Sequence, residues 1–160
     1  MLNRLAARQQ DINVAIIGIG SIGNGLVYQC HNTPHFKPVA IADIKIERAI
    51  TCAKWLGLDY QIVDSLAAMN EAVHQGKIAV TDNGELAAQC DQAEVLIEAS
   101  NAIAAGGQHA VAALTHNKHL VMMNYEADLM FGPALLPLAQ QNGFIIHHHQ
   151  MFVVGECGDG

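Results

Sequence analysis

Basic residues are scarce in this sequence. Its 160 residues include only 8 lysines and arginines against 15 aspartates and glutamates, so the formal net charge is −7. A domain that binds nucleic acid normally carries a basic stripe on one face, and no such stripe is present. The composition therefore predicts that DNA and RNA are not partners of this protein.

Long apolar runs are missing as well. No run reaches the ~18 residues that a helix needs to cross a bilayer, so we expect no membrane-spanning segment. The first ten residues, MLNRLAARQQ, lack the apolar centre of a signal peptide. They predict instead a short amphipathic helix with leucines on one side and arginines on the other.

Metal-binding and disulfide patterns are also absent. The four cysteines lie far apart and make no CxxC pair: Cys30, Cys52, Cys90 and Cys157. This spacing is typical of reduced thiols in a cytoplasmic protein. Three histidines occupy residues 147–149, but neighbours on a strand point to opposite faces and cannot all bind one ion. We therefore expect no metal site.

The sequence does contain enough apolar residues for one packed domain, with 51% hydrophobic and 14% charged residues. Strand-like apolar runs alternate with segments of helical spacing, and no internal repeat or domain boundary interrupts them. This alternation predicts an α/β fold, a Rossmann-type doubly wound parallel sheet with helices on both faces. Pro137 predicts a kink or a split in the last helix. The expected strands span residues 12–17, 38–42, 78–80, 93–99, 119–123 and 144–147, and the expected helices span 24–31, 46–56, 65–75, 83–90, 103–116 and 132–142.

The strongest chemical signal is the segment GIGSIG at residues 18–23, between the first strand and the first helix. It matches GxGxxG, in which the glycines permit a tight turn, close approach of a pyrophosphate and close helix packing. The start of the helix adds free N–H groups and the positive end of its dipole. The pattern predicts NAD or NADP as cofactor, although a glycine-rich turn without a ligand is an alternative. The candidate residues are Gly18, Gly20, Ser21, Ile22 and Gly23.

An acid stands at the end of the second expected strand. Asp43 follows Gly23 by twenty residues. A carboxylate at this place accepts the hydroxyls of the adenosine ribose and repels the 2′-phosphate of NADP, so Asp43 favours NAD. Lys45 and Arg48 lie just beyond and soften that repulsion, which leaves both cofactors open. Capping of the following helix is a second, compatible role for Asp43.

Two later segments follow strands at the same edge of the expected sheet. Ser100 and Asn101 come after the strand at 93–99, where ligands of open parallel sheets bind, although either residue is also a good helix cap. Glu126 and Asp128 come after the strand at 119–123. They are candidate catalytic acids, or simply acids favoured at a helix start by its dipole.

Four segments together resemble one family. In chain order they are VAIIGIGSIG, VAIADIKIERA, VLIEASN and the most distinctive one, NKHLVMMNYEADLMFGP. They resemble the N-terminal domain of homoserine dehydrogenase-like NAD(P)-binding oxidoreductases over roughly residues 1–146. Some members carry a C-terminal SAF domain, and the group includes a 1-deoxy-D-xylulose-5-phosphate reductoisomerase-like enzyme.

The resemblance implies an NAD(P)-dependent oxidoreductase and assigns roles to matching residues. It implies that Gly18, Gly20, Ile22 and Gly23 contact the pyrophosphate and that Asp43 binds the adenosine ribose. It also implies that Ser100 and Asn101 lie beside the nicotinamide. Glu126 and Asp128 match the acidic pair of the family. The sequence departs from true homoserine dehydrogenases at Tyr125, where they have a lysine after the asparagine. This departure argues against homoserine as the substrate.

The expected domain spans residues 1–147, and residues 148–160 are a divergent tail, interpreted as the truncated start of a missing substrate domain. The favoured function is hydride transfer to or from a small hydroxy or carbonyl substrate. One alternative is a dinucleotide-binding remnant or sensor without catalysis. Another is a reductoisomerase-like enzyme on a phosphorylated sugar, for which the chain offers few basic residues. The expected partners are a small-molecule substrate and either a second copy of the chain or a missing C-terminal domain.

Overall fold

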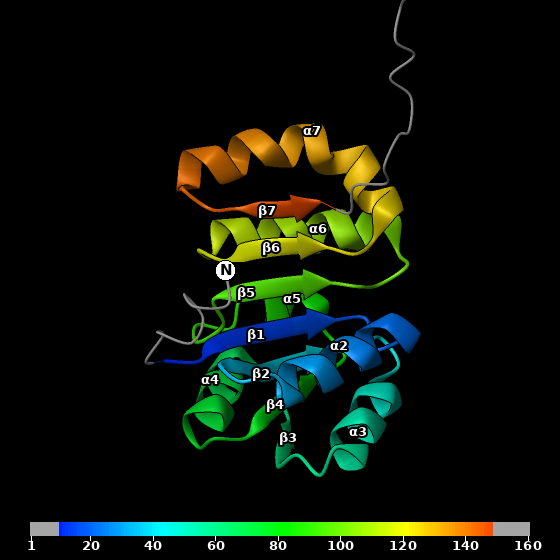
Figure 1. Cartoon of the computed structure of the whole chain (residues 1–160), viewed down its shortest axis with the longest axis vertical. Helices are drawn as coiled ribbons and strands as arrows, with labels where there is room; N and C mark the ends of the chain where they lie inside the picture. Colours follow the sequence, from blue (N-terminus) through cyan, green and yellow to red (C-terminus); the bar gives the residue numbers. More distant parts are fainter. Residues whose placement is uncertain (1–9, 149–160) are drawn as a thin grey trace, which may run out of the picture.

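The computed structural model describes residues 10–148, which contain seven strands in one sheet. The strands are β1 (Ile12–Ile17), β2 (Phe36–Ala42), β3 (Tyr60–Ile62), β4 (Ile78–Thr81), β5 (Val95–Glu98), β6 (His119–Met122) and β7 (Ile146–His148). Their order across the sheet is β3-β4-β2-β1-β5-β6-β7, and all neighbours are parallel (Figure 1). The predicted doubly wound parallel sheet is therefore confirmed.

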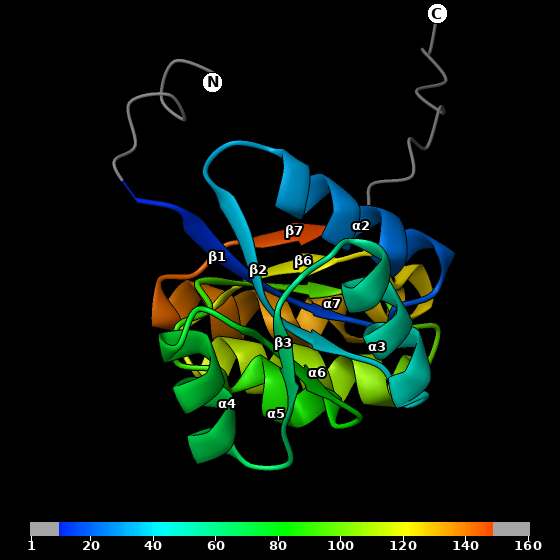
Figure 2. The same cartoon turned by 90° about the horizontal axis from the view of Figure 1, so that it is seen from below.

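Helices cover both faces of this sheet. They are α2 (Ser21–Asn32), α3 (Ile46–Trp55), α4 (Leu66–His74), α5 (Gly84–Ala88), α6 (Ile103–Thr115) and α7 (Tyr125–Asn142). α2 and α3 pack on one face, whereas α4, α5, α6 and α7 pack on the other (Figure 2). None of these helices, all within residues 10–148, has both the length and the apolar character needed to cross a membrane.

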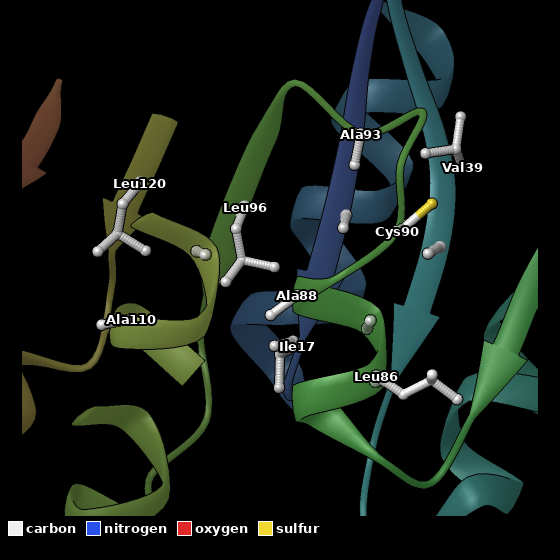
Figure 3. Close-up of a cluster of buried hydrophobic side chains, with 14 of the residues drawn as sticks. Ile17, Val39, Leu86, Ala88, Cys90, Ala93, Leu96, Ala110 and Leu120 are labelled. Carbon is white, nitrogen blue, oxygen red and sulfur yellow. The ribbon is translucent and has the colours of Figure 1, made fainter. Parts of the chain in front are cut away.

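The central strand β1 contributes to two separate cores. Val14 and Ile16 point toward α2 and α3, whereas Ala15 and Ile17 point toward the opposite helices. Figure 3 shows part of this second core, where Ile17 gathers with side chains of β5 and α5. Because both faces are covered, a central strand is apolar at nearly every position, which explains the run, interrupted only by Asn13, that predicted β1.

The order of the strands reverses beside β1. The chain runs from β1 outward through β2 to the edge strand β3, returns to β4 and then crosses to β5 on the other side of β1. The loops after β1 and β5 therefore diverge to opposite sides of the sheet. In open parallel sheets this divergence opens a crevice at the carboxyl ends of the strands, and ligands bind there.

The last helix differs from its prediction. The predicted helix began at residue 132, but α7 begins at Tyr125, because Asn124 caps it by accepting a hydrogen bond from the Ala127 N–H at 3.1 Å. The helix continues through Pro133 and Pro137, so the predicted split is wrong, and its path in Figure 1 is arched. Loss of proline N–H groups on an exposed face accounts for bending without a break.

The edge strand β3 was not predicted at all. It has only three residues, and Ile62 at its end is more than half exposed. A strand this short carries no usable alternation pattern, and its pairing with β4 is a tertiary event. The predicted amphipathic helix at residues 1–10, His149, Cys157 and the tail lie outside the described residues, apart from residues 10 and 148.

Three thiols and one lysine are buried in the described part of the chain. Cys30, Cys52 and Cys90 are unpaired, and burial raises the pKa of each thiol. Lys118 is only 2% exposed, and its Nζ donates to the carbonyl oxygens of Ala93 at 3.2 Å and His116 at 3.3 Å. Burial lowers the pKa of this ammonium, because the charged form is poorly solvated there.

The buried ammonium makes stability depend on pH on the alkaline side. Between the lowered pKa of Lys118 in the folded state and its ordinary value of 10.5, the unfolded chain binds more protons. The free energy of unfolding of the native protein should therefore rise with pH relative to that of a Lys118→Met variant. Urea denaturation of both proteins between about pH 7 and pH 10 measures this, since the pKa range of a lysine falls there. Parallel pH profiles would contradict it. The contributions of Cys30 and Cys52 cancel in the difference, and Cys90, which interacts with Lys118, is replaced by alanine in both proteins.

Candidate functional site

The turn between β1 and α2 is formed by backbone packed against backbone. Gly18 has a φ of +88°, and a Cβ there would overlap the Ser100 N–H and lie 2.6 Å from the Ala99 carbonyl carbon. A Cβ on Gly23 would overlap the Gly18 carbonyl oxygen. Only glycine fits at these two positions, because the first needs a left-handed backbone and both lack space for a side chain. The turn is thereby held against the loop after β5.

Gly20, the middle glycine of the motif, is different, because the position that a Cβ atom would occupy lies in open space. A Cβ on Gly20 would meet no atom of the described protein within 4 Å. Gly20 is also the N-cap of α2, and no side chain caps this helix. The amides of the first turn of α2 therefore have no side-chain acceptor, and together with the helix dipole they suit a phosphate.

Asp43 ties the turn to the loop that follows β2. Its side chain is 5% exposed, and its Oδ2 accepts a hydrogen bond from the Ile19 N–H at 2.8 Å, while its Oδ1 accepts one from the Lys45 N–H at 2.8 Å. Arg48 Nη1 lies 3.9 Å from Oδ2. Lys45, and not Asp43, is the N-cap of α3, so the capping role considered for Asp43 is wrong. Each carboxylate oxygen keeps acceptor capacity for a ribose hydroxyl.

The loop after β5 carries the other predicted polar residues. Ser100 and Asn101 lie between Glu98 and α6, and Ser100 Oγ donates to the buried Glu98 carboxylate. The N-cap of α6 is Ala102, whose N–H donates to Ser100 Oγ at 3.4 Å. Neither Ser100 nor Asn101 is therefore the N-cap residue of α6, which was the alternative role considered for them. Ser100 is available instead at the side of the crevice.

These three loops surround one cavity of about 420 Å³. Its volume is within the range of about 300–1,000 Å³ that is usual for small-molecule sites. The structure brings seven of the predicted residues into its wall: Gly18, Gly20, Ser21, Ile22, Asp43, Ser100 and Asn101. Gly23 lies beneath the turn and is buried rather than part of the wall.

The cavity wall also contains residues that the sequence analysis did not single out. They come from the loops after β2 and β4 and from α3, α5 and α6: Ile44, Arg48, Asp82, Gly84, Ala105 and His109. Arg48 was noted only as a nearby cation. Asp82 directly follows β4, so the strand-end rule that selected Asp43 would also have found it. His109 lies in the middle of α6, and nothing in the local sequence distinguishes it.

The acidic pair does not reach this cavity. Glu126 and Asp128 both lie in the first turn of α7, where Glu126 is exposed and Asp128 is buried at 8% exposure. Neither residue contributes to the cavity wall. The acids lie at the carboxyl edge of the same sheet, because α7 follows β6 directly. Within residues 10–148, no group of three or more His, Cys, Asp or Glu residues is arranged to hold a metal ion.

The fold and the cavity together define the class of the protein. A doubly wound parallel sheet, a switch point beside β1 and a glycine turn that leads into an uncapped helix are the features of a dinucleotide-binding Rossmann domain. Residues 18–149 match the family model described as the NAD-binding domain of homoserine dehydrogenase, and the chain belongs to this family. The predicted resemblance is confirmed, as is NAD(P) as the cofactor class. No match was found among curated proteins.

Solved structures with a similar fold include several oxidoreductases. A putative oxidoreductase from Klebsiella pneumoniae is 20% identical with a TM-score of 0.60, over 84% of this chain and 33% of its own. Scyllo-inositol dehydrogenase from Lactobacillus casei with NAD(H) and scyllo-inositol is 15% identical with a TM-score of 0.67, over 88% and 36%. A homoserine dehydrogenase from Thiobacillus denitrificans is 17% identical with a TM-score of 0.65, over 87% and 29%. At these identities the likeness shows the fold, and the chain spans about a third of each relative.

The packing beneath the turn can be tested with two glycines of the same helix. Gly23→Ala should lower the free energy of unfolding by about 3 kcal/mol, because the new methyl group overlaps the Gly18 carbonyl. Gly25→Ala is the matched control, since a Cβ there meets nothing within 4 Å and alanine favours a helix. Urea denaturation measures both variants. Equal stabilities of the two variants would refute the close contact.

Proposed function

We propose that this chain is the cofactor-binding part of an NAD(P)-dependent oxidoreductase in which a hydride moves between the nicotinamide and a small hydroxy or carbonyl substrate. The observation that carries the proposal is the cavity at the switch point, into which the uncapped start of α2 opens. The nicotinamide supplies the hydride chemistry when it is bound. The residues of this chain bind the cofactor and orient it.

The pyrophosphate is proposed to lie over the turn at Gly18 and Gly20. The open space above Gly20 allows its close approach, and the amides of Ser21, Ile22 and Gly23 in the first turn of α2 are its hydrogen-bond donors. Substitution at Gly20 would fill this space without disturbing the packed protein. The fit of an anion here therefore rests on an observed gap and on uncapped amides.

The adenosine ribose is proposed to bind Asp43. This carboxylate is held at the cavity wall by two backbone amides, so it is oriented before the cofactor arrives. Its negative charge favours the ribose hydroxyls of NAD over the 2′-phosphate of NADP. The half-exposed Arg48 beside it lowers that preference without reversing it.

The catalytic part of the proposal concerns Glu126 and Asp128. We propose them as proton-transferring groups, supported by their position at the carboxyl edge of the sheet. Because they lie outside the cavity wall, the substrate would have to bridge the nicotinamide and the start of α7. Val121 of β6 and His147 of β7 are incompletely buried on the sheet face that α2 and α3 share. A second copy of the chain or a further domain could cover this face and complete the substrate site.

The proposed pyrophosphate site at Gly20 predicts that a substitution there lowers the affinity for NADH without lowering the stability of the fold. Gly20→Ala should weaken NADH binding by about tenfold or more, because the methyl group occupies the space of a phosphate oxygen, a loss of about 1.4 kcal/mol. Its unfolding free energy should stay close to that of the native chain. Gly25→Ala, on the same helix but away from the cavity, is the control and should bind NADH normally. Titration by NADH fluorescence measures the affinities.

Turnover then separates the candidate functions. The native chain is incubated with NAD or NADP and a panel of small hydroxy acids and amino alcohols, and absorbance of the reduced nicotinamide is followed. Turnover supports an oxidoreductase whose substrate site is formed by this chain or by a second copy of it. Tight binding without turnover of any compound excludes that arrangement and is the result expected of a dinucleotide sensor or of a substrate site that a further domain completes. Failure to bind NADH and NADPH at all would overturn the whole proposal.

The preference for NAD is attributed to one charge. Asp43→Asn removes the negative charge at the ribose site, so the ratio of NADPH affinity to NADH affinity should rise by about tenfold. Asp64→Asn makes the same change of net charge at an exposed position outside the cavity wall and should leave the ratio unchanged. An equal rise in both variants would show a general effect of net charge instead.

A further inference from the structure

A second buried carboxylate lies behind the cavity wall. Glu98 is the last residue of β5 and is fully buried. Its Oε1 accepts hydrogen bonds from the Ser100 N–H at 3.3 Å and from the Ser100 hydroxyl, and it lies 3.4 Å from His109 Nδ1. Its Oε2 has no hydrogen-bond partner among the described residues. Among the described residues, all hydrogen-bond contacts of the Glu98 side chain are therefore made by Oε1.

His109 is held between this carboxylate and the start of α5. Its Nδ1 lies 3.4 Å from Glu98 Oε1, so a hydrogen on Nδ1 would be donated to this carboxylate. The Nε2 side of the ring packs against Gly84, where a Cβ would overlap Nε2 and lie 2.7 Å from the ring carbon Cε1. Glu98 itself is absent from the cavity wall, but Ser100 and His109 both belong to it. The Glu98 carboxylate therefore affects the cavity wall only through its contacts with Ser100 and His109.

The chemistry of these neighbours is constrained by their hydrogens. The single hydroxyl hydrogen of Ser100 is used by Glu98, so Ser100 Oγ can only accept further hydrogen bonds. It accepts one weakly from the Ala102 N–H at 3.4 Å and retains acceptor capacity. His109 lies on the other side of the same carboxylate oxygen, with its Nδ1 toward Glu98. The wall at Ser100 therefore offers an acceptor, whereas the start of α2 offers donors.

We propose that Glu98 is a positioning residue: by taking the hydroxyl hydrogen of Ser100, it makes Ser100 Oγ an acceptor for a hydrogen bond from a donor group of the bound dinucleotide. The donor is a ribose hydroxyl, the adenine amine or the carboxamide N–H. This inference rests on the proposed cofactor function. An acceptor at Ser100 disfavours a phosphate, which carries acceptors only, and so favours the start of α2 as the place of the pyrophosphate.

Two variants of Glu98 test the role of the acceptor. Glu98→Gln keeps an acceptor at the Oε1 position and places its amide nitrogen where Oε2 has no partner. It should bind NADH within about threefold of the native chain, a difference of less than 1 kcal/mol. Glu98→Met has a similar length but no acceptor, and it should weaken binding by about tenfold or more. Urea denaturation establishes that both variants are folded at the assay concentration. Equal losses in both variants would point to charge and overturn the proposal.

The ligand side of the contact is tested with Ser100→Ala and six NAD analogues. Each analogue lacks one donor: the 3-acetylpyridine analogue lacks the carboxamide N–H, the 1,N6-etheno analogue lacks the adenine amine, and two 2′-deoxy and two 3′-deoxy analogues each lack one ribose hydroxyl. The analogue that lacks the bonded donor should bind the native chain more weakly than NAD, but bind the Ser100→Ala variant as well as NAD does. If the substitution costs the same affinity with every analogue, Ser100 accepts nothing from the cofactor.

A measurement without cofactor separates this proposal from the proposed function. Two-bond ¹H–¹⁵N spectra of the native chain, with His109 assigned by comparison with a His109→Gln variant, report which ring nitrogen carries the hydrogen. We expect the hydrogen on Nδ1 in the native chain and a changed spectrum in Glu98→Met. A hydrogen on Nε2 alone would overturn the proposed acceptor role of Glu98, whatever the chain binds. Absence of NADH binding with the expected tautomer would instead refute the cofactor function.

Discussion

The close packing of backbone around Gly18 is the constraint on which the carboxyl edge of the sheet depends. The Gly18 N–H donates to the Ala42 carbonyl at 2.8 Å, its carbonyl lies under Gly23, and its α-carbon lies against the backbone at Ser100. Three loops therefore meet at a residue without a side chain. If this contact opened by the width of one methyl group, α2 would move away from β5 and the cavity would lose its shape.

Two buried carboxylates then fix the loops that this packing brings together. Asp43 holds the turn after β1 through the Ile19 amide, and Glu98 holds the loop after β5 through Ser100 and His109. A buried carboxylate is stabilised by donors, so each of these acids orients the backbone or side chains that donate to it. The donors at the start of α2 and the acceptor at Ser100 make two parts of the cavity wall chemically different. A dinucleotide can place an anionic phosphate at the donors and a hydroxyl or amine at the acceptor.

Several features of the fold were predictable because they depend on local chemistry. The nearly continuous apolar run of β1, the glycine spacing of residues 18–23 and the position of Asp43 each follow from rules that apply within a short segment. The extent of α7 was not predictable in the same way. Its prolines suggested a later start, but the Asn124 cap and the packing of Ala127, Leu135 and Ala139 on the sheet stabilise the longer helix. The strand β3 was missed because three residues at an edge carry no periodic signal.

By itself, the sequence determined the fold class, the cofactor class and the glycine turn that is proposed to receive the pyrophosphate, because each is encoded by residues adjacent in the chain. Only the tertiary structure decided which distant side chains share the cavity. It brought Asp82 and His109 into the wall and left Glu126 and Asp128 outside it. It also showed that Glu98, which reads in the sequence as one more strand residue, lies buried behind Ser100. Such relations depend on how strands are ordered and how helices cross them, and local spacing carries no information about either.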